Sequence, residues 1–347
     1  EFGRGATDMA GLLKRTGLNA LALSGGGGLV ARWRASRGVI LRFQRVVPLM
    51  SGGFAPQMRE HVSPEFFERL VRALPRWGFD LVSLDEAQTR LTSDWQGRPF
   101  ACLTFDSGYR DVHDHAWPIL RRNRAPFTIY VAANFVDHVG EAWWMALARI
   151  IETQTRIGLA VGNDEYRFVC TTRAQKAEVY HALEELLWSL QSDHDIRATM
   201  RELCMRYNVN LSSFNQYFLN WDQAREMAAD PLGTIGTQSV SHAILTKLRP
   251  SDAEKEMEMG RSVIEAAIGQ RPKHFAYPFG DARSFGAREV RMVQALGFST
   301  AVTAHPRAVR STDRDSLYAL PRISVRGDNR SLRYLKLFAR DVARPFA

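Results

Sequence analysis

An apolar segment that ends in an acidic and a hydroxyl residue is the part of this sequence most able to do chemistry. Residues 99–105 form a mostly apolar run of strand length, and Asp106, Ser107 and Gly108 follow it directly. Such a run ending at a glycine turn is typical of a buried parallel strand that leads into a functional loop. The sequence therefore places a carboxylate and a hydroxyl together at the carboxyl end of a strand.

Other polar residues follow short apolar segments in the same way. Gln44 lies near the end of a strand expected over residues 38–46, and Gln238 follows the segment 235–237. His242 comes four positions after Gln238. An imidazole can act as a base or a metal ligand, whereas a glutamine amide can only donate and accept hydrogen bonds. These positions predict a polar site at which His242 is the only imidazole.

The segments resemble, in order, the motifs of the polysaccharide deacetylases of carbohydrate esterase family 4. The family's first motif, Thr-Phe-Asp-Asp-Gly, is matched by residues 104–108, and its second, His-Ser/Thr-x-x-His after Ile-Gly, by residues 238–242. Residues 277–280 are similar to a Tyr-Pro-Phe/Tyr-Gly stretch in one branch. The resemblance covers about residues 38–322. It implies an α/β fold, a distorted parallel βα barrel with a helical insertion, whose pocket lies at the carboxyl ends of the strands.

The resemblance also implies that the usual metal site is altered. Asp106 matches the catalytic base, but Ser107 stands where a metal-binding carboxylate is expected and Gln238 replaces the first histidine. His242 is the one retained ligand, and Gln44 stands where related enzymes often have a histidine. Catalytic zinc normally has three protein ligands, and serine and glutamine are poor substitutes. We therefore expect no metal cofactor; zinc or another divalent ion belongs to an alternative in which the protein is an active deacetylase.

Further site residues come from the same resemblance. The backbone N–H of Tyr109 would be an oxyanion donor if acyl chemistry survives. The family's Leu-x-His motif is not found, because the matching segment reads Leu320-Pro321-Arg322. Arg322 can bind an anion but is not a useful proton donor. The residues expected to contact the substrate are Gln44, Gln238, Tyr277, Pro278, Phe279 and Arg322.

Three functions fit these residues. The first is a pseudoenzyme or repurposed pocket that binds or acts on an N-acylated sugar, polysaccharide or glycolipid without metal. It is favoured because the changes at Gln44, Ser107 and Gln238 all keep polar side chains. The second is an active metal-dependent N-deacetylase, or an inactivated mutant of one. The third is a hydrolase with Ser107 as nucleophile, His242 as base and Asp106 as orienting group, although the Gly-x-Ser-x-Gly elbow is missing.

Composition limits the class of protein. A chain of 347 residues with 45% hydrophobic residues is long enough for one barrel with an insertion. Its three cysteines, which lie far apart, predict neither a disulfide framework nor a zinc ribbon. No segment reaches the ~20 apolar residues of a spanning helix, and no signal peptide is recognised. A cytoplasmic protein, peripheral at a membrane if it meets one, is expected, with residues 1–8 an addition before a natural start at Met9.

The formal net charge of +9 favours an anionic partner. Nucleic acid is not expected, because no helix-turn-helix, zinc finger or RNA-binding signature accompanies the charge. A carbohydrate, polysaccharide or lipid-linked sugar fits the resemblance, and an anionic membrane surface is a further candidate. The basic segment 332–342 has Leu335 and Phe338 at helical spacing. It predicts either a membrane-surface helix or, as we favour, a helix docked on the barrel.

The expected organisation has four parts. Residues 1–36 form a helical segment with a glycine joint, residues 37–133 and 222–328 the barrel, and residues 329–347 a basic helix. Residues 134–221 form a helical insertion between the first two motif strands, where it would cap the groove. Trp143 and Trp144 in this insertion are expected to pack in the core rather than stack on sugar rings.

Overall fold

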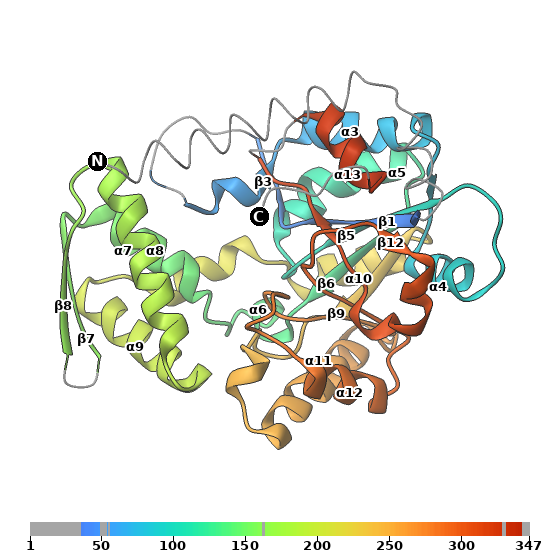
Figure 1. Ribbon diagram of the computed structural model, residues 1–347. Helices are drawn as coiled ribbons and strands as arrows, with labels where there is room; N and C mark the ends of the chain where they lie inside the picture. The colour runs from blue at the N-terminus through green and yellow to red at the C-terminus, as the bar shows by residue number, and fades with distance from the viewer. Residues whose placement is uncertain (1–35, 49–53, 55, 162–163, 328–330, 342–347) are drawn as a thin grey trace.

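A computed structural model describes residues 36–48, 54, 56–161, 164–327 and 331–341 of the chain. Most of the predicted N-terminal segment, including its glycine joint, lies outside these residues. The described part forms one curled, mostly parallel sheet wrapped by helices, as the sequence predicts (Figure 1). The pattern of continuous apolar strands separated by helical segments explains this architecture, because a parallel sheet must be covered on both faces.

The main sheet has the strand order β11-β10-β9-β6-β5-β1-β12, with β4 and β13 paired beside β5 and β1. The neighbours from β1 to β11 pair in parallel, and β12 is antiparallel to β1. Every residue of the predicted strand β5 is buried. The strands of this sheet are β1 (Ser36–Phe43), β4 (Asp80–Leu81), β5 (Phe100–Phe105), β6 (Phe127–Val131), β9 (Gly233–Thr237), β10 (His274–Ala276), β11 (Thr300–Val302), β12 (Val309–Arg310) and β13 (Ile323–Ser324).

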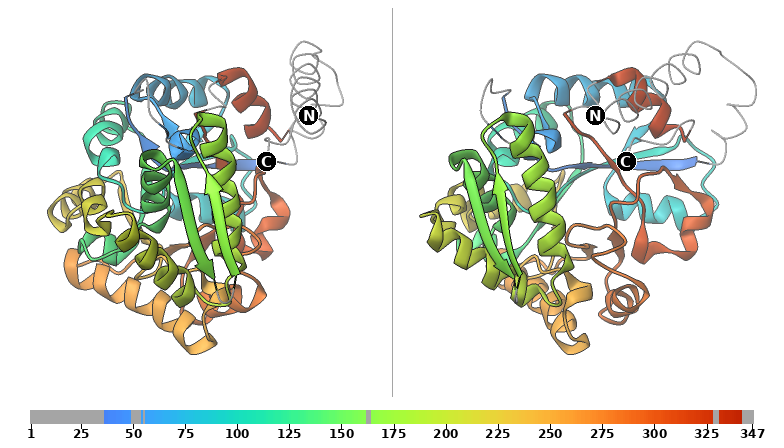
Figure 2. Two further views of the ribbon diagram at one scale, coloured as in Figure 1. Left: turned by 90° about the vertical axis from the view of Figure 1, so that its left-hand side faces the viewer. Right: turned by 60° about the vertical axis from the view of Figure 1, so that its left-hand side comes forward.

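Helices surround the curled sheet. Helices α3 and α13 lie at one side of the molecule and α11 and α12 at the opposite side (Figures 1 and 2). The α3 helix begins as predicted at Ser63, whose hydroxyl accepts a hydrogen bond from the Phe66 N–H at 3.2 Å. The helices around the sheet are α3 (Pro64–Arg76), α4 (Leu84–Thr92), α5 (Trp117–Arg122), α6 (Ala133–Val136), α10 (Trp221–Ala229), α11 (Pro250–Ile268), α12 (Ala287–Ala295) and α13 (Leu332–Ala339).

Short elements complete the barrel. Strands β2 (Arg45–Val46) and β3 (His61–Val62) form a small parallel pair, and a π-helical turn, η2 (Val112–Ala116), precedes α5. The remaining short elements are 3-10 helices, namely η1 (Pro56–Glu60), η3 (Leu211–Tyr217), η4 (Leu245–Lys247), η5 (Ser311–Asp315) and η6 (Leu317–Ala319).

The insertion between β6 and β9 is mainly helical, as predicted, but it also holds a hairpin that the sequence reasoning missed. Strands β7 (Arg156–Val161) and β8 (Asp164–Val169) pair with each other and with no other strand among the described residues. Along β8 the side chains alternate between exposed and half-buried, which is the pattern of a strand and not of a helix. Helices α7 (Trp143–Thr153), α8 (Arg173–Ser189) and α9 (Asp193–Arg206) lie beside this hairpin (Figure 2).

The C-terminal helix α13 is docked on the barrel, the arrangement favoured from the sequence. Leu335 and Phe338 are buried in the main core. Beyond the helix, the carboxylate of Asp341 accepts a hydrogen bond from Arg310 at 2.5 Å. The apolar face of α13 is therefore used in packing against the barrel. Among the described residues, no helix combines the length and apolar character needed to cross a bilayer.

Candidate functional site

The predicted polar residues meet at one edge of the sheet. The N–H of Asp106 donates to the Phe43 carbonyl at 3.0 Å, and the N–H of Gln238 donates to the Val131 carbonyl at 2.8 Å. These backbone bonds continue the parallel ladder just beyond the strands. Because parallel strands end at the same edge, Ser107 and Gln238 are neighbours although they are 131 positions apart in sequence. The structure thus brings together Asp106, Ser107, Gln238 and His242.

Several residues at this edge have left-handed backbone conformations. The φ angles are 69° at Ser107, 65° at Ser239, 60° at His242 and 61° at Phe279. For residues other than glycine this region costs roughly 1 kcal/mol or more, and such residues gather at functional sites. The strain is located in the segments that match the family motifs, so the surrounding structure holds these side chains in fixed orientations.

A cavity of about 550 Å³ opens beside this edge. Its aromatic lining comes from both the barrel and the insertion, so the insertion forms part of the cavity wall. Trp143 and Trp144 are only 2% and 8% exposed, yet both border the cavity, so they pack in the core and also form its wall. The lining aromatic residues are Phe54, Trp143, Trp144, Tyr180, Trp188 and Phe279. Ser107, His242, Gln44 and Arg42 line its floor.

Asp106 is held by two guanidinium groups. Arg42 Nε lies 2.6 Å from Asp106 Oδ2, while Arg322 places Nη1 at 2.6 Å from Oδ1 and Nη2 at 2.9 Å from Oδ2. Burial by itself would raise the pKa of Asp106, but the charges of Arg322 and Arg42 outweigh it and hold the pKa below its ordinary value. Arg322 is fully buried and does not border the cavity, so its guanidinium is used by Asp106 and not by an external anion.

Ser107 and Gln238 contact each other directly. Gln238 Oε1 accepts a hydrogen bond from the Ser107 N–H at 2.8 Å and lies 3.5 Å from the Ser107 hydroxyl. The glutamine carbonyl therefore has a partner within the protein, and Gln238 lies behind the cavity wall instead of bordering it.

His242 lies in an aromatic cage. Its ring centre is 5.1 Å from that of Trp144, 4.9 Å from that of Phe279 and 5.8 Å from that of Phe135. Burial lowers the pKa of His242 to about 3, so the imidazole is neutral at physiological pH. Within the described part of the chain its Nδ1 atom is buried without a hydrogen-bond partner.

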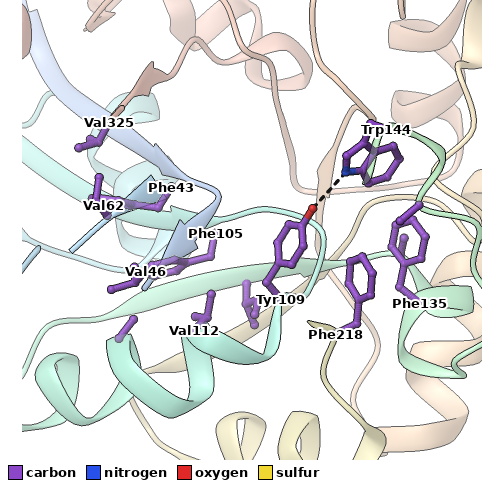
Figure 3. Close-up of a cluster of buried hydrophobic side chains, with 14 of the residues drawn as sticks. Phe43, Val46, Val62, Phe105, Tyr109, Val112, Phe135, Trp144, Phe218 and Val325 are labelled. Atoms are coloured by element: carbon purple, nitrogen blue, oxygen red, sulfur yellow. Dashed lines mark hydrogen bonds between the residues drawn. The ribbon is translucent and has the colours of Figure 1, made fainter. Parts of the chain in front are cut away.

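The side chains of the two tyrosines of the prediction do not border the cavity. The Tyr109 hydroxyl accepts a hydrogen bond from Trp144 Nε1 at 3.3 Å, and its ring stacks on Phe218 with centres 4.8 Å apart (Figure 3). Burial raises the pKa of Tyr109 to about 12. The Tyr277 hydroxyl donates to the Tyr318 carbonyl at 2.8 Å, and in the same turn Phe279 borders the cavity whereas Pro278 does not. Both tyrosine side chains are structural, and the proposed oxyanion role of the Tyr109 backbone N–H stays a prediction.

Comparison with known proteins identifies the fold and the family. A sequence profile described as polysaccharide deacetylase matches residues 95–301, which is more than half of the chain. The protein belongs to the polysaccharide deacetylase family. No curated protein sequence matches it significantly.

Solved structures of deacetylases share its fold. The Streptococcus pyogenes deacetylase PplD in complex with acetate superposes with a TM-score of 0.58 at 16% identity, over 88% of this chain and 99% of that one. IcaB from Ammonifex degensii gives 0.56 at 18% identity, over 88% and 98% of the two chains. The BpsB deacetylase domain from Bordetella bronchiseptica gives 0.50 at 15% identity, over 83% and 95%. At these identities the likeness concerns the fold alone.

The side chains at the family's metal position do not fit a catalytic zinc ion. His242 supplies one nitrogen, Ser107 a neutral hydroxyl, and the carbonyl oxygen of Gln238 is already bonded to the Ser107 N–H. No group of three or more histidine, cysteine or acidic side chains is close enough to hold a metal among the described residues. Catalytic zinc requires about three protein ligands, and carboxylate or thiolate ligands offset its charge. This deacetylase-family site offers one suitable ligand.

The geometry also does not support the serine hydrolase alternative. Asp106 is bound by Arg42 and Arg322, and no hydrogen bond joins it to His242 in the described part of the protein. The Ser107 hydroxyl lies against Gln238 instead of an imidazole. Because a nucleophilic serine needs a base within hydrogen-bond reach, and that base needs an orienting group, the chain of three residues is not formed.

Some cavity residues were missed by the sequence reasoning as members of the site. Arg42 lies near the end of β1, two positions before Gln44, which directly follows the strand. This period-two spacing, which puts both side chains on one face, was the available signal. Arg59 and Arg173 lie in segments that match no family motif, so only the folded structure brings them to the cavity.

Proposed function

We propose that this protein binds an N-acylated sugar, polysaccharide or glycolipid in its cavity and does not carry out metal-dependent deacetylation. The observation that carries the proposal is the state of Asp106, the residue that matches the family's catalytic base. Both of its carboxylate oxygens are bonded to guanidinium groups, at 2.6 to 2.9 Å. A general base needs a free oxygen within reach of the proton that it takes, and its pKa should lie near the working pH. Asp106 meets neither condition.

The remaining groups of the site are suited to binding. A neutral imidazole at His242 and a hydroxyl at Ser107 are hydrogen-bonding groups that line the cavity floor. Arg42 uses Nε for Asp106 and lies 3.3 Å from the Ser324 hydroxyl through Nη1. Its remaining N–H groups are donors of the kind that an acyl carbonyl oxygen accepts. Aromatic side chains such as Trp188 give the apolar faces on which sugar rings pack.

The second candidate is an active metal-dependent N-deacetylase. Family membership and the retained Asp106 and His242 favour it. In that case a metal would be held by His242 with weaker oxygen donors, and the metal would activate water and polarise the acyl carbonyl. The donor set described above counts against this candidate.

Metal analysis, a binding assay and an activity assay distinguish the two candidate functions. The purified protein is incubated with zinc, desalted and analysed for metals by elemental mass spectrometry. Chito-oligosaccharide binding is measured by calorimetry, and acetate release is measured beside an Asp106→Asn control. We expect little metal, binding of the oligosaccharide, and no acetate release above the control. Near-stoichiometric metal together with acetate release would make the protein an active deacetylase and overturn the proposal.

A further inference from the structure

The cavity is lined by more cations than anions. Five arginines and three carboxylates border it, namely Arg42, Arg59, Arg173, Arg283 and Arg326 against Glu60, Glu184 and Asp281. Three of these arginines are engaged: Arg42 binds Asp106 at 2.6 Å, Arg283 binds Glu185 at 2.9 Å and Arg326 binds Glu60 at 2.8 Å. Arg59 and Arg173 form no ion pair or side-chain hydrogen bond with any described residue. Within the described structure, the cavity therefore has two arginines whose charges are not offset by a neighbouring carboxylate.

These two arginines come from two different parts of the cavity lining. Arg59 lies in η1, whose backbone is fixed to the segment after β13 because the Arg59 carbonyl accepts a hydrogen bond from the Gly327 N–H at 2.6 Å. Arg173 is the first residue of α8 in the insertion. Close to these two elements, the Phe54 ring, before η1, and the Tyr180 ring, in α8, lie 6.4 Å apart. Both arginines are exposed to solvent and border the cavity.

The floor below them is also positive. Arg42 and Arg322 share the single carboxylate of Asp106, which leaves one net positive charge there. Next to it His242, which is 5% exposed, borders the cavity with a buried nitrogen that has no partner in the described structure. Asp281 lies elsewhere in the lining, near Arg283 at 3.4 Å, and Glu184 lies 3.8 Å from His181. The excess positive charge thus borders the cavity at β1, η1 and the start of α8, and the carboxylate of Glu60 in η1 is paired with Arg326.

We infer that the cavity takes an anionic N-acylated glycan, whose carboxylate or phosphate group is bound by Arg59 and Arg173 while an N-acylated sugar lies on the aromatic wall. This inference rests on the proposed function and adds the chemical class of the ligand. Guanidinium groups present paired N–H donors that match the oxygens of carboxylates and phosphates. A partly enclosed cavity strengthens such contacts, because solvent screens them less than on an open surface.

The test compares glycans that differ in charge. Calorimetry measures the binding of hyaluronan oligosaccharides, which alternate N-acetylglucosamine with glucuronate, and of neutral chito-oligosaccharides of the same length. Oligogalacturonates, which carry carboxylates without N-acyl groups, form a third arm. N-acetylglucosamine 1-phosphate against N-acetylglucosamine distinguishes a phosphate from a carboxylate as the favoured anion. We expect at least one anionic N-acetylated probe to bind about tenfold more tightly than its neutral counterpart.

Charge-matched variants locate the effect. In the Arg59→Gln/Arg173→Gln variant the advantage of the anionic probe should disappear, while binding of the neutral probe stays within about twofold. The Arg76→Gln/Arg291→Gln variant removes the same charge from exposed arginines on α3 and α12 that do not border the cavity. This control variant should still bind the anionic probe more tightly than the neutral one. Circular dichroism and thermal melting check that both variants fold like the natural sequence.

The outcomes separate the inference from the proposed function. Equal binding of charged and neutral N-acetylated probes would overturn the inference and leave the proposed function standing. Equal losses in both double variants would also overturn it, because the effect would then come from net charge and not from this site. Binding of oligogalacturonate alone would support an anion site but overturn the N-acylated glycan as its ligand. No binding of any probe would overturn both.

Discussion

Two carboxylates that follow the same strand have opposite electrostatic states. Asp106 and Asp111 are 1% and 6% exposed, so burial disfavours the charged form of each. Asp111 accepts hydrogen bonds from Arg45 Nε at 2.6 Å and from the Val46 N–H at 2.8 Å, but burial prevails and its pKa is raised. Asp106 has a second guanidinium, and its pKa is lowered although burial is still the largest single influence. Asp106 thus contacts two guanidinium groups and Asp111 one, and their pKa values are shifted in opposite directions.

The difference matters for function because the two states suit different tasks. A carboxylate with a raised pKa takes up a proton at a higher pH than usual, whereas one held between two arginines is a fixed anion. At the position of the family's catalytic base, this chain has the fixed anion. Its arginines in turn place an excess positive charge at the cavity floor, which is the property that the inferred anionic ligand would use.

The largest effect is expected when the buried ion pair of Asp106 and Arg322 is broken. The Arg322→Leu variant leaves a buried carboxylate with one partner and also loses the hydrogen bond from Arg322 Nε to the Thr303 carbonyl at 2.8 Å. We expect a loss of about 3–5 kcal/mol in the free energy of unfolding, measured by urea denaturation. The Arg45→Leu variant, which affects Asp111, should lose less, because Asp111 accepts a proton more easily and keeps its backbone donor.

A double variant controls for packing in this experiment. Combining Arg322→Leu with Asp106→Asn removes the orphan charge and should recover part of the lost stability. If Arg45→Leu proves as damaging as Arg322→Leu, or if the double variant is no better than the single one, the contrast between the two carboxylates is not electrostatic.

The next prediction concerns the metal ligands. Restoring the family's residues with Ser107→Asp and Gln238→His should give a site with three suitable ligands. Since the loss of even indirect support for one ligand costs about 10 to 100-fold in affinity, the variant should bind zinc at least about 100-fold more tightly than the natural sequence. Calorimetry and zinc-dependent melting measure this. A Ser213→Asp variant, which adds the same charge at an exposed position, is the control. Equal zinc binding by all three proteins would contradict the argument from the donor set.

The pH dependence of stability should differ for the two carboxylates. Because the folded-state pKa of Asp106 is lowered, its contribution to stability is complete above the unfolded-state value of about 4 and is lost as the pH falls through the folded-state pKa. The pKa of Asp111 is raised, so its contribution becomes less favourable as the pH rises from about 4 through its folded-state pKa. Asp106 should therefore affect the pH dependence of stability below the unfolded-state pKa of about 4, and Asp111 above it.

Denaturation curves of single variants at several pH values measure how the free energy of unfolding changes with pH. Asp106→Asn should reduce the loss of stability below about pH 4, whereas Asp111→Asn should reduce the decline on the neutral side of that value. Slopes that change in the same direction in both variants would contradict the assigned pKa directions.

The sequence predicted the barrel and the segments of the site well, since strand β5 is a continuous apolar run and the family motifs follow strand ends. It did not predict that Arg42 and Arg322 clamp Asp106, because the residues are 64 and 216 positions from it and meet only when β1, β5 and β13 pair. The hairpin over residues 156–169 was missed since a half-exposed hairpin is only a weak signal beside strong helical patterns. Contacts over long sequence separations, and not local pattern, decide these features.

The smallest effect is expected from a variant that leaves Asp106 with one guanidinium partner, as Asp111 has. In Arg42→Gln, Asp106 keeps both bonds from Arg322 and so has one guanidinium, like Asp111. Arg42 is 14% exposed at the cavity, so water can replace part of its contact, and we expect a loss of about 1 kcal/mol in the free energy of unfolding. The pKa of Asp106, followed by carbon-detected NMR of the carboxyl group, should rise relative to the natural sequence.

Arg90→Gln, which removes an arginine of similar exposure that pairs with Asp80 at 2.8 Å, is the matched control and should leave the pKa of Asp106 unchanged. An unchanged pKa in Arg42→Gln would mean that Arg322 alone sets the state of Asp106, and the second guanidinium would then serve the ligand and not the carboxylate.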